Sequence, residues 1–104
     1  MPGRPARVLC TGNDAGLLES RCAVLNYSGY RAEAATVSEA EVLLRMEPYD
    51  LVIISAQTSE WDRGLILLAA GGTPTYVLHG VTFAAELLAQ TERSLIPQKS
   101  SGTT

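Results

Sequence analysis

The sequence has little of what membranes, nucleic acids and metal ions require of a protein. No stretch approaches the roughly 20 consecutive apolar residues that a membrane-spanning helix needs. The 8 basic residues are outnumbered by 11 acidic ones, and the formal net charge of -3 gives no basic surface for phosphate backbones or anionic lipid. The two cysteines, Cys10 and Cys22, lack the paired close spacing of zinc or haem sites. We therefore predict that the protein binds no nucleic acid and no membrane, and that it holds no metal and no cofactor.

The first residues, MPGRPARVLCTG, contain two prolines and no apolar core, so we do not expect them to form a signal peptide. Both cysteines lie in apolar surroundings, which predicts reduced core residues and a cytoplasmic protein. At 104 residues, the chain has room for one domain with a modest core and little surplus for a large active-site cleft. We therefore expect that the protein is not an enzyme.

Short apolar runs predict most of the strands. They lie at Val8–Cys10, Leu51–Ile54 and Tyr76–Leu78. Continuous runs of this length are typical of strands buried on both faces in a parallel sheet that helices cover. The segment Arg31–Thr36 (RAEAAT) alternates and is only weakly apolar, which indicates a short edge strand whose charges discourage further pairing.

Helical patterns separate these strands. Apolar residues recur at helical spacing from Ala15 to Ser28, with Asn13 or Asp14 as the cap and Gly29 at the end. Ser38-Glu39-Ala40-Glu41 has the form of a capping box and opens a second helix that Pro48 closes. Further helices are predicted for Glu60–Ala70, with Ser59 and Asp62 as a looser box and Gly71-Gly72 as the stop, and from Thr82 to about Leu95.

Strands and helices thus alternate, and each crossover is long enough for a right-handed parallel connection. We predict an α/β fold, a small doubly wound parallel sheet of four strands with about four helices. After Ile96 the sequence PQKSSGTT has nothing to bury, so we expect a flexible tail.

Three stretches carry a resemblance to a known family. They are residues 17–30 (LLESRCAVLNYSGY), Tyr49–Ile54 (YDLVII) and Thr73–Leu78 (TPTYVL). In this order and spacing they resemble the receiver domain of bacterial response regulators. The resemblance implies a flavodoxin-like sheet of order 2-1-3-4, a domain at residues 7–95, and flexible termini at residues 1–6 and 97–104.

The chain is shorter than a full receiver, because only one helix follows the fourth strand. Residues 82–89 (TFAAELLA) resemble the last helix of the family, which implies that one helix-strand unit has been lost. In that register the last helix packs beside the first, and each face of the sheet carries two helices. Whether this helix corresponds to the fourth or the fifth helix of the family stays open.

The carboxylates that receivers use for phosphorylation are missing. The resemblance implies that the acidic pair after the first strand falls on Gly12 and Asn13, with Asp14 one place late. The phosphoacceptor aspartate falls on Ser55, and the switch residue after the fourth strand is His79. Mg²⁺ normally takes carboxylate ligands, and a serine hydroxyl is a poor phosphoryl acceptor without an activating base. We interpret these five residues as a degenerate phosphorylation site.

The function predicted is a phosphorylation-independent, receiver-like signalling and interaction module in a bacterial two-component (phosphorelay) context. Its partner is a protein of a signalling pathway, and a homodimer is left open. Candidate contact surfaces are the exposed edge of the fourth strand and the first helix together with the last. Trp61, the only tryptophan, is a further candidate contact, because exposed aromatic residues often anchor interfaces.

Two alternatives belong to other classes. Residues 11–14 (TGND) lead into a helix N-terminus and could bind a small ligand, a phosphate or a nucleotide, although one glycine and no lysine do not make a P-loop. The other alternative, the third hypothesis for the function, is a cryptic hydrolase that uses Ser55 and His79 with Asp14, because all three follow predicted parallel strands. Ser55 lacks the flanking glycines of a nucleophile elbow.

Overall fold

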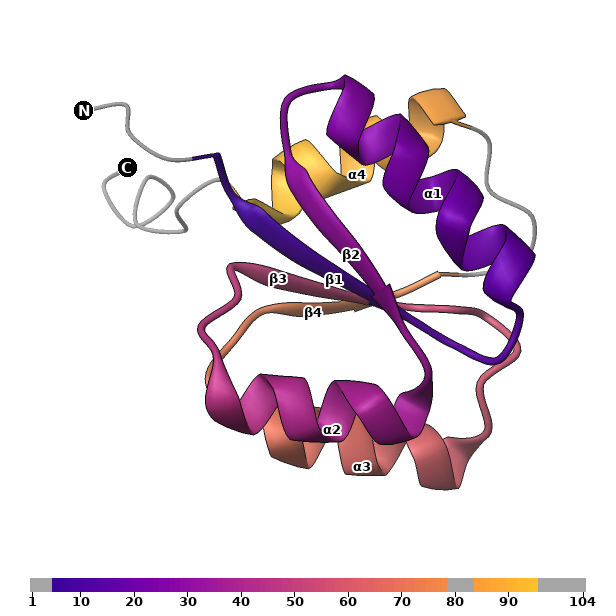
Figure 1. Ribbon diagram of the computed structural model, residues 1–104, viewed down its shortest axis with the longest axis vertical. Helices are drawn as coiled ribbons and strands as arrows, with labels where there is room; N and C mark the ends of the chain where they lie inside the picture. The colour runs from indigo at the N-terminus through magenta and orange to yellow at the C-terminus, as the bar shows by residue number, and fades with distance from the viewer. Residues whose placement is uncertain (1–4, 79–83, 96–104) are drawn as a thin grey trace, which may run out of the picture.

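The protein folds around one four-stranded parallel sheet, in the order β2-β1-β3-β4 (Figure 1). The structure is a computed structural model and describes residues 5–78 and 84–95. The strands are β1 (Arg7–Thr11), β2 (Arg31–Ala35), β3 (Leu51–Ile54) and β4 (Thr75–Val77). The predicted fold class and strand order are confirmed, and β2 lies at one edge of the sheet as expected.

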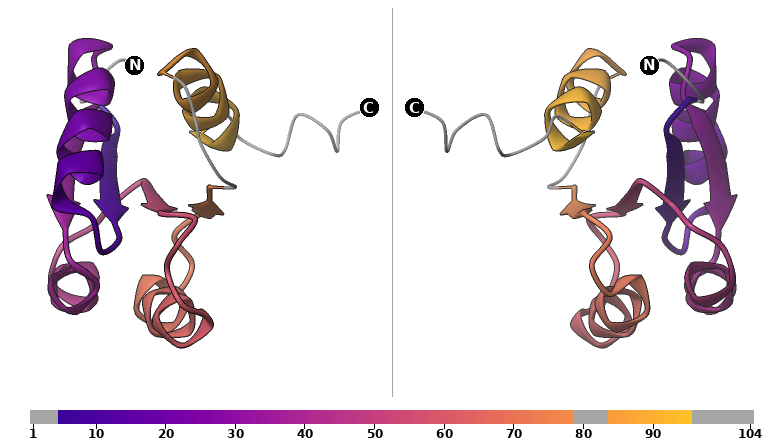
Figure 2. Two further views of the ribbon diagram at one scale, coloured as in Figure 1. Left: turned by 90° about the vertical axis from the view of Figure 1, so that its right-hand side faces the viewer. Right: turned by 90° about the vertical axis from the view of Figure 1, so that its left-hand side faces the viewer.

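Helices cover both faces of the sheet, as Figures 1 and 2 show. They are α1 (Ala15–Tyr27), α2 (Val37–Met46), α3 (Glu60–Ala70) and α4 (Ala84–Leu95). The last helix lies beside the first on one face, and α2 and α3 cover the other. Alternate side chains of a strand point to opposite faces, so Val8 and Cys10 join the core under α1 and α4. Leu9, between them, joins the core under α2 and α3.

Burial follows the position of each strand in the sheet. Every residue of the central strand β3 is 2% exposed or less, as its unbroken apolar run predicts. The outer strand β4 is only half-buried from Thr75 to Val77, so the expectation that this segment is buried on both faces is wrong for most of it. Its position at the edge explains the difference, because a neighbouring strand covers it on one side only.

The start of α2 corrects one prediction. The capping box is formed by Thr36 and Glu39, not by Ser38 and Glu41. The Thr36 hydroxyl accepts from the Glu39 N–H at 3.3 Å, and the Glu39 carboxylate accepts from the Thr36 N–H at 3.0 Å. Both tetrapeptides fit the pattern of a capping box, and the earlier start buries Val37 and Ala40 against the sheet. Tertiary burial therefore selected between two equivalent local signals.

The other helix ends agree with the sequence patterns. Asp14 caps α1, and Gly29, with φ of 101°, follows its end in a conformation that other residues rarely adopt. Ser59 caps α3 by accepting from the Asp62 N–H at 3.1 Å. The expectations for Thr82 as a helix start, and for flexibility at residues 1–4 and 97–104, lie outside the described residues.

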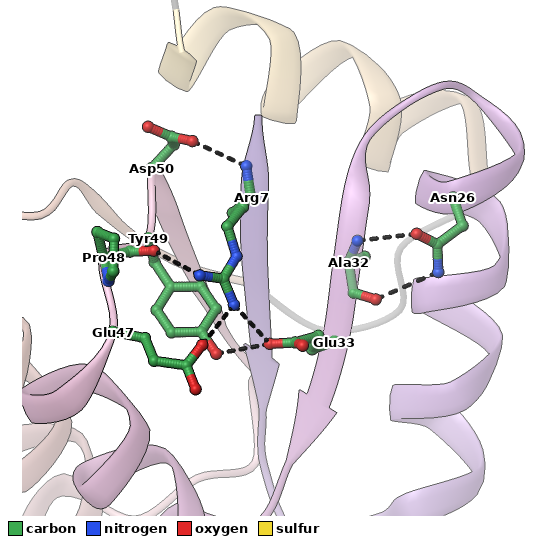
Figure 3. A network of polar contacts seen from close by, with 8 residues as sticks. All are labelled: Arg7, Asn26, Ala32, Glu33, Glu47, Pro48, Tyr49 and Asp50. Carbon is green, nitrogen blue, oxygen red and sulfur yellow. Dashed lines mark hydrogen bonds and ion pairs between the residues drawn. The ribbon is translucent and has the colours of Figure 1, made fainter. Parts of the chain in front are cut away.

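The amino-terminal end of the sheet is held by a polar network around Arg7 (Figure 3). Its guanidinium donates to the Pro48 carbonyl at 3.2 Å and pairs with Glu47 at 2.8 Å and Glu33 at 3.3 Å. It also lies 4.4 Å from the centre of the Tyr49 ring, in cation–π contact. Arg7 thus connects β1 to β2 and to the segment between α2 and β3. Sequence reasoning missed this network because its members are far apart in the chain.

Candidate functional site

The candidate site lies where β1 and β3 end, at the same edge of the sheet. The Ser55 N–H donates to the Thr11 carbonyl at 3.0 Å, so the ladder between the strands continues to this point. Gly12, the residue that follows β1, is therefore packed against Ser55. A Cβ atom on Gly12 would overlap Ser55 Oγ and lie 2.7 Å from Ser55 Cβ, so a larger residue fits only if Ser55 shifts.

Arg21 enters the site from α1. Its Nη1 donates to Ser55 Oγ at 2.7 Å, and Ser55 is 7% exposed. Arg21 lies three residues after Leu18 and four before Leu25, two buried residues of the same helix. It therefore lies at the margin of the face that α1 turns toward the core. Sequence reasoning missed Arg21, although this spacing was a usable signal.

Asp14 is the single carboxylate that the resemblance leaves near the site. Its Oδ1 accepts from the Leu17 N–H at 3.1 Å, which is the bond of a helix N-cap. Asn13, before it, is exposed. Across residues 5–78 and 84–95, no three His, Cys, Asp or Glu side chains lie close enough to hold a metal ion. Asp14 thus caps α1 and belongs to no metal-ligating cluster of three such side chains in the described part of the chain.

A cleft of about 970 Å³ opens above these residues, between α1 and α4. One part of its lining is polar and includes Arg21, Ser55 and Gln57. The other part is apolar and includes side chains from both helices. The full lining is Asn13, Asp14, Ala15, Gly16, Leu17, Ser20, Arg21, Val24, Ser55, Ala56, Gln57, Ala84 and Leu87. The site therefore combines a cationic group with an apolar wall.

Comparison with known proteins shows which fold this architecture has. No family model and no curated protein sequence matches the chain. Among solved structures, the non-phosphorylated HemR receiver domain from Leptospira biflexa is similar, with a TM-score of 0.72, 23% identity, and coverage of 89% of this chain and 96% of that one. The chain has the receiver fold.

Two further receiver structures are similar to it. One is a CheY-like response regulator receiver domain from Methanospirillum hungatei, with a TM-score of 0.66, 21% identity, and coverage of 93% of this chain and 98% of that one. The other is a CheY-like receiver domain from Methylobacillus flagellatus, with a TM-score of 0.68, 13% identity, and coverage of 86% and 98%. The receiver fold thus spans nearly the whole chain.

The receiver fold brings together most of the residues singled out from the sequence. Gly12, Asn13, Asp14 and Ser55 meet at the carboxyl end of the sheet, and all but Gly12 line the cleft. His79 lies outside the described residues. In the described part of the chain, no helix is both long and apolar enough to cross a bilayer.

Trp61 lies away from this site. It belongs to the first turn of α3, on the opposite face of the sheet, and is 75% exposed. The partner contact proposed for Trp61 is therefore separate from the cleft.

Both cysteines belong to the core beneath α1 and α4. A hydrogen bond with the Cys22 thiol, followed by burial, raises the pKa of Cys10. A raised pKa keeps this thiol protonated, and only the thiolate is a strong nucleophile. The geometry therefore agrees with a packing role for Cys10.

Proposed function

We propose that this protein is a receiver-like signalling module of a bacterial two-component pathway that acts through protein contacts, without Mg²⁺-dependent aspartyl phosphorylation. The observation that supports this most strongly is the 2.7 Å bond from Arg21 to Ser55. Ser55 stands where the resemblance expects the phosphoacceptor aspartate. A neutral hydroxyl held by a guanidinium takes the place of a carboxylate that would attract a metal ion.

Electrostatics disfavours a divalent cation at this position. The guanidinium of arginine keeps its positive charge at any physiological pH. Two unit charges of the same sign 4 Å apart repel by about 4 kcal/mol near a protein surface, and Mg²⁺ carries two. Asp14 supplies a single negative charge against the two positive charges of Mg²⁺, and its Oδ1 also caps α1. A metal at the degenerate site therefore lacks the ligands to offset this repulsion.

Two measurements on the purified protein test the proposal. One is labelling with radioactive acetyl phosphate in the presence of Mg²⁺, beside a receiver with intact carboxylates. The other is a two-dimensional amide NMR titration with Mg²⁺ and then beryllofluoride. We expect no label above background and unchanged peaks at Gly12, Asp14 and Ser55. Rapid labelling, or saturable shifts at these peaks, would overturn the proposal.

Contacts with a partner require a surface, and the edge of β4 provides backbone groups for one. In the segment Thr73–Leu78, the Pro74 carbonyl accepts from the Val52 N–H, and the Leu78 N–H donates to the Ile54 carbonyl. The backbone groups of the even-numbered residues in this segment therefore face β3. Because successive residues point to opposite sides, the N–H and C=O groups of Thr75 and Val77 face away from the sheet. The segment Thr73–Leu78 carries no charge to discourage pairing.

We propose that the strand added at this edge comes from a second copy of the chain. An antiparallel pair centred on Tyr76 sets Thr75 of each copy opposite Val77 of the other. Both are outward-facing residues, so each pair can exchange its two hydrogen bonds. The helix α3, which precedes β4 in the chain, carries the exposed apolar side chains of Leu67 and Leu68.

The hydrolase alternative has less support. Ser55 Oγ accepts a hydrogen bond from a guanidinium, which cannot take up the serine proton as a general base would. The small-ligand alternative, in contrast, gains an observation that favours it, the cleft between α1 and α4.

A further inference from the structure

We propose that the cleft between α1 and α4 binds a small organic monoanion, with its charged group on Arg21 and Ser55 and its apolar body against the two helices. This inference goes beyond the signalling role and does not depend on it. The sequence offered, as an alternative, a ligand site on the backbone of the loop after β1, whereas the site proposed here consists of side chains within the receiver fold. Three features of the cleft support it, namely charge, shape and the neighbouring carboxylate.

The first feature is the unbalanced charge of Arg21. All 11 acidic side chains of the protein fall within the described residues. In this part of the chain the ion pairs join Arg7 to Glu33 and Glu47, and Arg63 to Glu60. No described carboxylate therefore pairs with Arg21, whose bond partner is the neutral Ser55 hydroxyl. A half-buried guanidinium without a counter-ion favours an anion from solution.

The second feature is the size and lining of the cleft. Its volume of about 970 Å³ falls within the range of roughly 300 to 1,000 Å³ that is usual for small-molecule sites. Apolar side chains from both helices form the wall beside Arg21, with Leu17 and Val24 on α1 and Leu87 on α4. Leu17 is 47% exposed, so a ligand here would cover apolar surface that now faces water.

The third feature limits the charge of the ligand. Asp14 lines the same cleft, so a second negative charge on the ligand would be repelled by its carboxylate. A carboxylate or sulfonate with one negative charge satisfies Arg21 without that cost, whereas a phosphate dianion does not. Small apolar acids are therefore the chemical class that the lining fits best.

Binding would change the hydrogen bonds of the site. The anion would accept from the Arg21 guanidinium, through two parallel N–H bonds if it is a carboxylate. The Ser55 hydroxyl can both donate and accept, so it can turn its proton toward the same oxygen. A ligand held in this way contacts α1, α4 and Ser55, the residue that follows β3. It would therefore bias the position of α4 against α1 and give the module an input other than phosphorylation.

A matched pair of probes tests the proposal on the unmodified protein. Octanoate and 1-octanol have the same apolar tail, and only octanoate is charged at neutral pH. We expect octanoate to shift the amide peaks of Arg21, Ser55 and Gln57 saturably and with an apparent Kd at least tenfold lower than that of 1-octanol. Equal effects of the two probes, or shifts confined to α2 and α3, would overturn the proposal.

Variants and a third probe sharpen the test. Arg21→Gln should raise the apparent Kd for octanoate at least tenfold, while Arg45→Gln, an exposed arginine on α2, should leave it unchanged. Thermal melts establish that both variants are folded, and Ser55→Ala replaces Arg21→Gln if that variant fails to fold.

Inorganic phosphate should bind more weakly than octanoate, and the reverse order would contradict the assigned ligand class. Acetyl phosphate labelling is a separate assay, so either proposal can fail alone.

Discussion

At the scale of single residues, Gly12 determines how closely the backbone that follows β1 can approach Ser55. We expect Gly12→Ala to lower the free energy of unfolding by about 1–3 kcal/mol, because the new methyl group overlaps the Ser55 side chain. Urea denaturation measures the change. Gly12→Ala combined with Ser55→Gly should recover part of the loss, since the overlapping atoms are gone.

Gly64→Ala is the matched control for Gly12→Ala. Gly64 lies inside α3, and an added Cβ meets no atom within 4 Å. Alanine is the better helix former, so this variant should gain about 0.5–1 kcal/mol. If Gly12→Ala were also neutral or stabilising, the close packing between Gly12 and Ser55 would be wrong.

Tyr49 should make stability fall at high pH. Burial first, and then its hydrogen bond to the Glu33 carboxylate, raises the pKa of the phenol above its ordinary value of 10.0. The unfolded chain therefore loses this proton at a lower pH than the folded one. The stabilisation is complete below about pH 10 and is lost as the pH rises toward the folded pKa. The melting temperature should decline above pH 10.

The variant Tyr49→Phe isolates this contribution. It should melt lower than the wild type at pH 7, because the bond to Glu33 is lost, and its melting temperature should decline less between pH 10 and 11. The raised pKa of Cys10 acts in the same direction in both proteins, so it cancels in the difference. Parallel declines for the two proteins would show that Tyr49 is not the source.

At the scale of elements, the start of α2 distinguishes two capping boxes. Thr36→Ala should cost about 1 kcal/mol, because the Glu39 N–H loses its acceptor. Ser38→Ala should be neutral or slightly stabilising, since Ser38 is exposed inside the helix, where alanine is preferred. Thermal unfolding of both variants decides the matter, and a larger loss for Ser38→Ala would place the box where the sequence alone suggested.

Sequence patterns predicted the elements well, for a local reason. Apolar period, caps and glycines act within a few residues, so the bounds of α1 and α3 follow from neighbours in the chain. They could not choose between Thr36 and Ser38, because both open the same tetrapeptide pattern. That choice depends on Val37 and Ala40 reaching the sheet, which is a tertiary requirement.

At the scale of the whole molecule, the position of β4 at the edge of the sheet leads us to predict self-association. Sedimentation velocity over a range of concentrations should show a monomer and a dimer in equilibrium. Thr75→Pro removes an N–H that faces away from β3, and proline is tolerated at such edge positions, so the fold should survive. We expect this variant to weaken the dimer at least tenfold.

The other edge of the sheet supplies the control. Arg31 on β2 donates to Ala6, so Ala34 faces away from β1 in the same way that Thr75 faces away from β3. Ala34→Pro should therefore leave association unchanged. A wild-type protein that stays monomeric at every concentration, or equal effects of the two prolines, would exclude β4 as the contact between copies.

The sequence alone determined the fold class, the order of the elements and the meeting of residues 12–14 with Ser55. These follow from local patterns, from the rule that parallel strands end at one edge, and from the resemblance to receivers. Only the tertiary structure decided that Arg21 reaches Ser55 and that a cleft opens between α1 and α4. It also decided the partners of Arg7, which are separated from it in the sequence by 26 to 43 positions. The physical reason is that a guanidinium extends far from its own backbone. Its partner depends on which distant segments the packed sheet brings within reach.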